Sequence, residues 1–247
     1  MLPFFAFMDP LYLLILVIGL VLSGGAALLV KSRFARGQQV GLRSGLSGAE
    51  IAARILRDAG IHDVDIVEHR GFLSDHYNPL NKTLVLSPAV YRGRNAAAAG
   101  VAAHEVGHAI QHAESYALLM LRSALVPIAG IGSNLGLWLV IIGMFMGSAQ
   151  QAAADQHGVA YYMALGGVIL FGAAALFAVI TVPVEFDASS RAKRRLAQIG
   201  IVGHGEESAA VSGVLTAAGL TYVAAAVTAL LQLLYWAFRA GLVGGDE

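Results

Sequence analysis

The chain has 247 residues, of which 57% are hydrophobic and only 13% are charged. A soluble domain usually carries about twice that share of charged residues, so the composition favours a membrane protein. The formal net charge is zero, which argues against nucleic acid as a partner. The chain contains no cysteine, which excludes a disulfide framework and a thiolate metal site. Any metal ion must therefore be held by nitrogen and oxygen ligands.

Long stretches without Asp, Glu, Lys or Arg predict four transmembrane helices. Each can supply the roughly 20 apolar residues that cross a bilayer. Four long apolar helices buried in so small a soluble protein are the less favoured alternative. The first stretch is expected to be an uncleaved anchor. A signal peptide would have basic residues before its apolar segment, and none precedes this one. The expected spans lie near 11–30, 124–146, 161–184 and 216–238.

Positive charge is distributed asymmetrically along the chain. Of the 16 Lys and Arg residues, all but Arg239 lie in 31–123 or 185–210. With four spans these two segments fall on one side of the membrane, and the positive-inside rule places that side in the cytoplasm. The sequence thus predicts a multi-pass protein of the plasma (inner) membrane with both termini extracytoplasmic. The expected parts are 1–30 (tail and anchor), 31–123 (cytoplasmic catalytic domain), 124–184 (transmembrane hairpin), 185–215 (cytoplasmic helix) and 216–247 (last span and tail).

The segment 31–123 predicts a small α+β domain. A helix is expected over 47–61, with Ser47 as N-cap and Glu50 completing a capping box. A short strand is expected over 64–69, and a turn at 78–79 leads into a second strand over 83–86. An Ala-rich helix is expected to begin near Asn95 and to extend to 114.

The stretch "HEVGH" in this last helix predicts a zinc site. Residues four apart on a helix differ by about 400°, so His104 and His108 lie on one face and can reach one ion. Glu105 points about 100° away and can lie beside a zinc-bound water as a general base. Two histidine ligands and one glutamate base are the elements of an HExxH zinc peptidase.

A third protein ligand must come from elsewhere. His112 lies about 12 Å from His104 along the helix axis, too far for one ion, so a supporting or surface position is expected for it. Glu185 is the preferred candidate, because the predicted topology returns it to the cytoplasmic side. A helix beginning after Pro183 would place Glu185 and Ser189 on one side. Asp187 is the alternative ligand, or a partner for a ligating histidine.

The stretches "GFLSDHYNPLNKTLVLSPAVYRGRNAAAAGVAAHEVGHAIQHA" and "PVEFDASSRA" resemble the YugP-type family of bacterial membrane zinc metallopeptidases, over nearly the whole chain. The resemblance extends to membrane gluzincins, which take two histidines from HExxH and a glutamate from a later helix. It implies one Zn²⁺ held by His104, His108 and Glu185, with Glu105 as base. It also implies that a strand over 82–87 pairs with the backbone of a protein or peptide substrate at the membrane.

The oxyanion of such a reaction needs a donor besides zinc. His76, Tyr77 and Arg191 are candidates by residue type, although "DHY" at 75–77 is equally typical of a turn in which Asp75 accepts backbone N–H groups. Two other functions are considered: a non-catalytic zinc-binding membrane scaffold and an intramembrane protease of the site-two type. Membrane lipid is an expected partner, and an oligomer or a regulatory membrane partner is compatible with the sequence.

Overall fold

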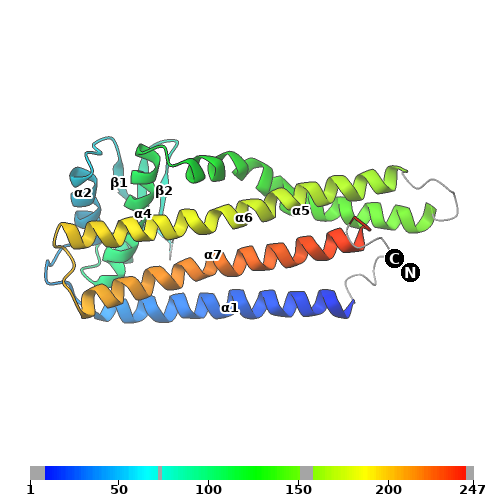
Figure 1. The fold of residues 1–247 in the computed structure, drawn as a ribbon. Helices are drawn as coiled ribbons and strands as arrows, with labels where there is room; N and C mark the ends of the chain where they lie inside the picture. The colour runs from blue at the N-terminus through cyan, green and yellow to red at the C-terminus, as the bar shows by residue number, and fades with distance from the viewer. Residues whose placement is uncertain (1–8, 72–73, 151–157, 243–247) are drawn as a thin grey trace. The chain divides into compact units, whose positions relative to one another are not determined.

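The computed structural model describes residues 9–71, 74–150 and 158–242, which are mostly helical (Figure 1). Its contacts divide the chain into two compact units. The helical unit comprises Met1–Gly24, Leu121–Thr181 and Val223–Glu247. The mixed unit comprises Gly25–Met120 and Val182–Tyr222. Each of the long helices α1, α5, α6 and α7 contributes residues to both units.

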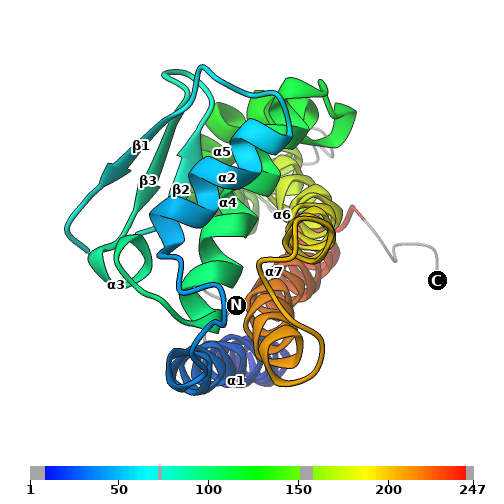
Figure 2. The same ribbon diagram turned by 90° about the vertical axis from the view of Figure 1, so that its left-hand side faces the viewer.

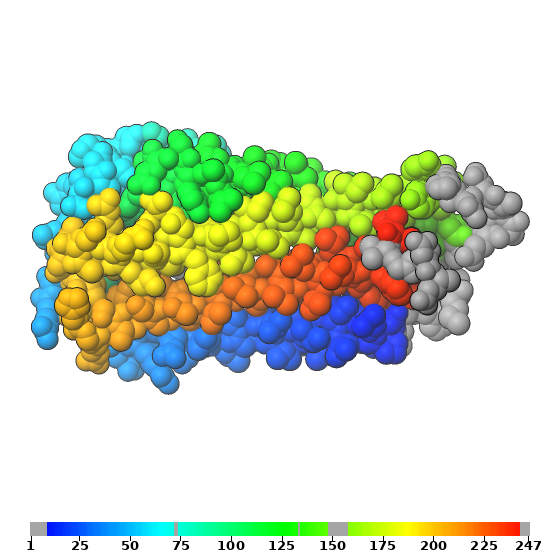
Figure 3. Space-filling model, viewed as in Figure 1, coloured from blue at the N-terminus to red at the C-terminus, as the bar shows by residue number. Residues whose placement is uncertain are grey.

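The helical unit contains segments of four helices: α1 (Pro10–Gln39), α5 (Ala117–Gln150), α6 (Val159–Gln198) and α7 (Glu206–Arg239). By length and composition α1, α6 and α7 can each cross a membrane, and a fourth span results if α4 and the first part of α5, bent by 97°, count as one. Large apolar side chains such as Leu20 and Val21 are exposed. In the space-filling view α1, α7 and α6 lie side by side in this unit (Figure 3). An apolar outer surface of this kind suits a bilayer.

Glycine brings α5 and α6 into backbone contact within the helical unit. A Cβ added to Gly132 would lie 2.3 Å from the carbonyl oxygen of Leu170, and one added to Gly143 would lie 2.6 Å from the backbone nitrogen of Ala164. Only residues without a side chain permit so close an approach. Small residues at helix contacts are typical of transmembrane packing, where close van der Waals contact drives association.

The mixed unit contains α2 (Gly48–Asp58), β1 (Asp65–Glu68), β2 (His76–Asn78), β3 (Thr83–Leu86), α3 (Pro88–Tyr91) and α4 (Ala96–Ala113). The predicted capping box of α2 is confirmed, because Ser47 and Glu50 exchange side-chain and backbone hydrogen bonds. Asn95 caps α4 by accepting the N–H of Ala98. The predicted strand over 64–69 is confirmed with slightly shorter bounds, and α3 is an element that the sequence pattern did not indicate.

The three strands form one sheet in the order β1-β3-β2, with β3 parallel to β1 and antiparallel to β2. The prediction that the strand over 82–87 pairs with substrate is therefore wrong, because both edges of β3 are hydrogen-bonded within the chain. The free edges belong to β1 and β2. His76 and Tyr77 lie in β2, opposite Val85 and Leu84.

The core of the mixed unit is apolar and surrounds α4. Figure 2 shows α4 between the sheet on one side and α6 and α7 on the other. Fully buried alanines of α4 pack among Ile51 and Ile55 of α2, Leu84 and Leu86 of β3, and side chains of α6 and α7. At about 25 cal/mol per Å2 this burial holds α4 in place, and with it the HEVGH residues.

Pro183 lies inside α6 and does not begin a new helix. The expectation of a helix starting after Pro183 is wrong. Proline removes one hydrogen bond of an α-helix, but packing on both sides can compensate for that cost. The neighbouring residue Val184 is fully buried. As a result Glu185 is carried on one continuous helix.

Candidate metal centre

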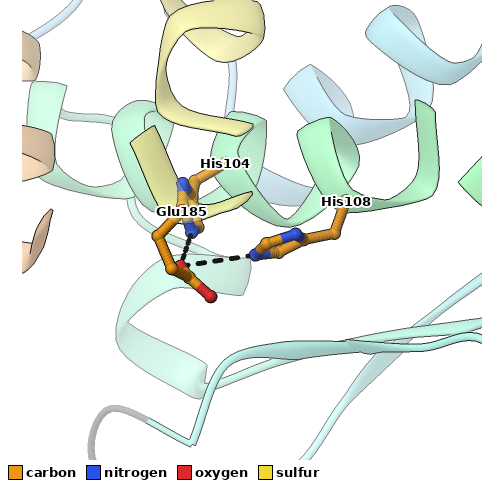
Figure 4. A group of neighbouring side chains, drawn as sticks. All are labelled: His104, His108 and Glu185. Atoms are coloured by element: carbon orange, nitrogen blue, oxygen red, sulfur yellow. Dashed lines mark hydrogen bonds and ion pairs between the residues drawn. The ribbon is translucent and has the colours of Figure 1, made fainter. Parts of the chain in front are cut away.

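His104, His108 and Glu185 meet in the mixed unit and could hold a metal ion. Their ligand atoms all lie within 4.8 Å of one another. Figure 4 shows both imidazole rings, from α4, directed at the carboxylate from α6. The Oε2 of Glu185 lies 3.1 Å from Nε2 of His104 and 3.5 Å from Nε2 of His108. The two rings are nearly perpendicular, with an interplanar angle of 80°.

These separations suit a tetrahedral zinc ion. Zinc binds His nitrogen and carboxylate oxygen at about 2.0–2.2 Å, so two ligands of a tetrahedral site are roughly 3.3–3.6 Å apart. Of the two distances from Glu185 to the histidines, 3.5 Å lies within this range and 3.1 Å lies about 0.2 Å below it. Two nitrogens and one oxygen are also the ligand set of several catalytic zinc sites, which leave a fourth position open. The residues present therefore fit this ion.

A glycine allows α4 to lie close enough to α6. A Cβ on Gly107 would lie 2.6 Å from the carbonyl oxygen of Ala188, well inside van der Waals contact. Ala188 itself is fully buried. Any larger residue at position 107 would push the helices apart and move Glu185 away from the two histidines.

Each histidine makes a hydrogen bond through its other ring nitrogen. Nδ1 of His104 lies 3.1 Å from Oγ of Ser189, one turn after Glu185 on α6. Nδ1 of His108 lies 2.9 Å from Oε1 of Gln111. Such partners fix the orientation of a ligating ring. In both rings this leaves Nε2 directed at Glu185.

The amide of Gln111 is held in one orientation. Its Nε2 donates to the carbonyl oxygen of Val184 at 2.9 Å and to Oδ2 of Asp187 at 2.8 Å. Both partners are acceptors, so the amide oxygen must face His108. Nδ1 of His108 then carries a proton, and Nε2 is the ring nitrogen that faces Glu185 and could bind a metal ion. Sequence reasoning missed Gln111, although its i+3 spacing from His108 on one helix would have indicated the contact.

Asp187 and Arg191 extend this network away from the three possible metal ligands. Arg191 donates to Asp187 and to Glu114, each at 2.5 Å, and stacks on the ring of Tyr116. Burial would raise the pKa of Asp187, but the hydrogen bonds from Gln111 and Arg191 outweigh it and hold the pKa below its ordinary value. Asp187 therefore reaches His108 only through Gln111. Arg191 is paired with two carboxylates at this place and does not line the cavity described below.

Glu185 is almost completely buried, with 1% of its surface exposed. Burial alone would raise the pKa of the carboxyl, but the hydrogen bonds with His104 and His108 outweigh it and hold the pKa far below its usual range. Glu185 is thus a buried carboxylate, and its negative charge is stabilised by two imidazoles. A divalent cation among these three groups would supply the missing positive charge.

A cavity of about 380 Å3 is lined by two of these three residues, His104 and Glu185. Glu105 lines it together with His104 and Glu185, and only 7% of its surface is exposed. Asp75, just before β2, lies at the same cavity and accepts the backbone N–H and the hydroxyl of Ser87. The turn expected at 75–77 is wrong, because His76–Asn78 forms strand β2, although Asp75 does accept a backbone N–H, that of Ser87. Burial is the largest influence on Asp75 and raises its pKa.

The remaining predicted residues lie around this centre. His112, at the end of α4, has Nδ1 2.9 Å from the hydroxyl of Tyr77 and does not belong to the group of possible metal ligands among the described residues. Nδ1 of the exposed His76 lies 2.9 Å from the carbonyl oxygen of Ser74. Neither His76 nor Tyr77 lines the cavity, and their role as oxyanion donors stays a prediction.

The fold and this centre point to a membrane zinc peptidase, and comparisons with known proteins agree. The model of a family described as "Putative neutral zinc metallopeptidase" matches residues 12–241, so the chain belongs to this family of zinc metallopeptidases, which are hydrolases. A relative from Bacillus subtilis (strain 168), named "Putative membrane protease YugP", is 43% identical over 224 residues, which are 91% of this chain and 94% of the relative. No solved structure matches the chain significantly. The predicted resemblance to the YugP-type family is thereby confirmed.

Proposed function

We propose that this protein is a membrane zinc endopeptidase or exopeptidase whose ion is held by His104, His108 and Glu185. The observation that carries the proposal is the meeting of these ligands beside Glu105 at one cavity. When bound, zinc would polarise the scissile carbonyl and lower the pKa of its water toward about 7. This assignment makes the protein a gluzincin with an HExxH motif.

The protein groups then have separate tasks. Glu105 receives the proton of the attacking water at its carboxylate and returns it to the leaving amine. Gln111 and Ser189 keep the two imidazoles oriented, with Nε2 available to the metal ion. We further propose that a substrate backbone pairs with the free edge of β2, because β3 has no free edge and Asp75 next to β2 reaches the cavity.

The proposed setting is the plasma membrane, with four spans and the metal centre on the cytoplasmic side. The three long apolar helices and the membrane relative support a membrane protein. The orientation rests on the positive-inside rule, because almost all Lys and Arg residues lie in 31–123 and 185–210. Substrates would be membrane-associated proteins or proteins at the cytoplasmic face.

Two variants test the catalytic assignment. Glu105→Gln should retain zinc but lose peptide hydrolysis by about 100-fold or more, since general-base catalysis contributes at least that much. Glu185→Ala should lose the metal itself, which elemental analysis of purified protein would detect. Hydrolysis by Glu105→Gln at the wild-type rate would contradict the base, and a full zinc content in Glu185→Ala would contradict the third ligand.

A non-catalytic zinc-binding scaffold is the other function to be tested. It would need the three ligands but not Glu105, which is buried and faces the cavity. If wild-type and Glu105→Gln proteins bind zinc equally and neither cleaves any peptide, the scaffold is correct. The intramembrane protease of the site-two type is less favoured, because α4 packs among α2 and the sheet.

A further inference from the structure

The cavity at the metal centre has two chemically different sides. The polar side is formed by His104, Glu105, Glu185, Ser189 and Asp75, with Val101 of α4 as its one apolar residue. The opposite side is formed by α1 and α7 and is apolar apart from the hydroxyls of Thr221 and Tyr222. Its apolar residues are Ala27, Val30, Val214, Leu215, Ala218 and Gly219. No Lys or Arg is among the described residues that line the cavity.

The volume limits what can enter. At about 380 Å3 the cavity lies near the lower end of the roughly 300–1,000 Å3 found for small-molecule sites. It has room for a scissile peptide group and a neighbouring side chain, but not for a folded segment. Two of its residues on α7 are small, namely Ala218 and Gly219, so the width of the cavity depends on that helix.

Packing against α6 fixes the position of Ala218 and Gly219. A Cβ on Gly219 would lie 3.0–3.4 Å from three ring atoms of Phe186, so the ring lies directly on the glycine. Phe186 follows Glu185 in the chain, and the same contact therefore holds α7 next to the helix that carries the proposed ligand. The apolar side of the cavity is thus at a fixed distance from the metal centre.

We propose that this cavity accepts an apolar side chain of the residue next to the scissile bond, and that Ala218 limits its size. The inference rests on the proposed peptidase function. When the scissile carbonyl of the substrate lies at the metal centre beside Glu105, the side chain of the neighbouring substrate residue faces α1 and α7. A charged side chain there would be moved from water to a wall whose polar groups are two hydroxyls, those of Thr221 and Tyr222, at a cost of several kcal/mol, whereas Leu or Phe would gain by burial.

The test uses purified, zinc-loaded full-length protein in detergent micelles and a peptide library randomised around one position. Wild type should cleave next to Leu, Met or Phe at least 10-fold faster, in kcat/KM, than next to Asp, Glu or Lys. Ala218→Leu should lower kcat/KM for the large apolar residues by about 10–200-fold while affecting Ala-containing peptides less. Ala218→Val, a smaller change, should give an intermediate shift.

Thr216→Leu is the matched control, because Thr216 is exposed on the same helix and does not line the cavity. It should leave the preference unchanged. A preference for charged residues in wild type, or equal preferences in wild type and Ala218→Leu, would overturn the inference while leaving the peptidase intact. Absence of cleavage by zinc-loaded wild type would contradict the peptidase, and this inference with it.

A binding measurement separates specificity from turnover. Small hydroxamates carrying a leucine-like or a glutamate-like side chain should bind zinc-loaded Glu105→Gln protein with affinities that differ by at least 10-fold, the leucine-like compound being tighter. Ala218→Leu introduced into that protein should remove the difference. If zinc-loaded Glu105→Gln protein that keeps Ala218 bound the two compounds with equal affinity, the pocket would not be apolar.

Discussion

The Nδ1 of His108 donates a hydrogen bond to Oε1 of Gln111 at 2.9 Å, and the amide of Gln111 cannot rotate away. The carbonyl oxygen of Val184 and the carboxylate of Asp187 both require its NH2 group. One fully buried glutamine therefore links the tautomer of a proposed metal ligand on α4 to the backbone of α6, one residue before Glu185. Under the proposed function, Gln111 is a positioning residue for the metal centre.

Replacement of Gln111 by Met should weaken zinc binding by about 10–100-fold, as loss of a supporting partner does in other metal sites. Methionine has a similar volume and keeps the core filled, but it leaves His108 without a directed acceptor. The measurement is competition for zinc against a chelator of known affinity. Thermal unfolding of the metal-free protein serves as the control, and unchanged zinc affinity in Gln111→Met would contradict the positioning role.

Gly107→Ala should separate α4 from α6 and reduce zinc affinity. The added Cβ would meet the carbonyl oxygen of Ala188 at 2.6 Å, an overlap that costs about 1–3 kcal/mol of stability. Gly100→Ala on the same helix is the matched control, because its Cβ would meet its nearest neighbour at 3.6 Å, an ordinary contact. The control should be neutral or more stable, since alanine favours helix by about 1 kcal/mol. Equal zinc affinities in the two variants would show that the helix spacing does not depend on Gly107.

The parts of this fold that local patterns specify were predictable. Ser47 and Asn95 are caps whose partners lie three residues away, and the HEVGH spacing places two histidines on one helical face. The approach of Glu185 was also predictable, because alternating charged and apolar segments determine which side of a membrane each segment reaches. These inferences need no knowledge of side-chain packing.

The parts of the fold that depend on packing between distant segments could not be predicted from the sequence. Periodicity alone does not give the order of strands, so the central position of β3 and its lack of a free edge could not be read from the sequence. Pro183 indicates a helix start by its local chemistry, and tertiary contacts override that preference. Gln111 acts on His108 only because Val184 and Asp187, more than 70 residues later, fix its amide.

Glu207 should stabilise the mixed unit in a pH-dependent manner. Its carboxylate accepts the backbone N–H groups of Gly203 and Arg43, at 2.7 and 2.9 Å, and these bonds hold its pKa below the ordinary value. A carboxyl whose pKa is lower in the folded state contributes stability above its unfolded pKa and loses it as the pH falls. The destabilisation caused by Glu207→Gln should therefore be largest at neutral pH, should begin to decrease near the unfolded pKa of about 4.3, and should vanish below the lower pKa of the folded state.

Glu206→Gln is the control for this experiment, because the exposed Glu206 precedes Glu207 in the same first turn of α7 and feels the same helix dipole. Thermal unfolding in detergent at several pH values would give the comparison. Glu206→Gln should have the smaller effect. If the two variants are equally destabilised, or if the effect of Glu207→Gln is independent of pH, the two backbone hydrogen bonds do not explain the stability.

The proposed membrane orientation can be tested by labelling, because the chain has no cysteine of its own. A single cysteine at Lys193, which is exposed on α6 beyond the apolar part of that helix, should be protected from a membrane-impermeant maleimide in intact cells. A cysteine at Asp155, between the second and third predicted spans, should react. Both should react after the membrane is permeabilised, which controls for access. The opposite pattern would place the metal centre outside the cytoplasm and would contradict cytoplasmic-face substrates. If both sites reacted alike in intact cells, the hairpin predicted over 124–184 would not cross the membrane, although the contact between Glu185 and the HEVGH histidines would be unaffected.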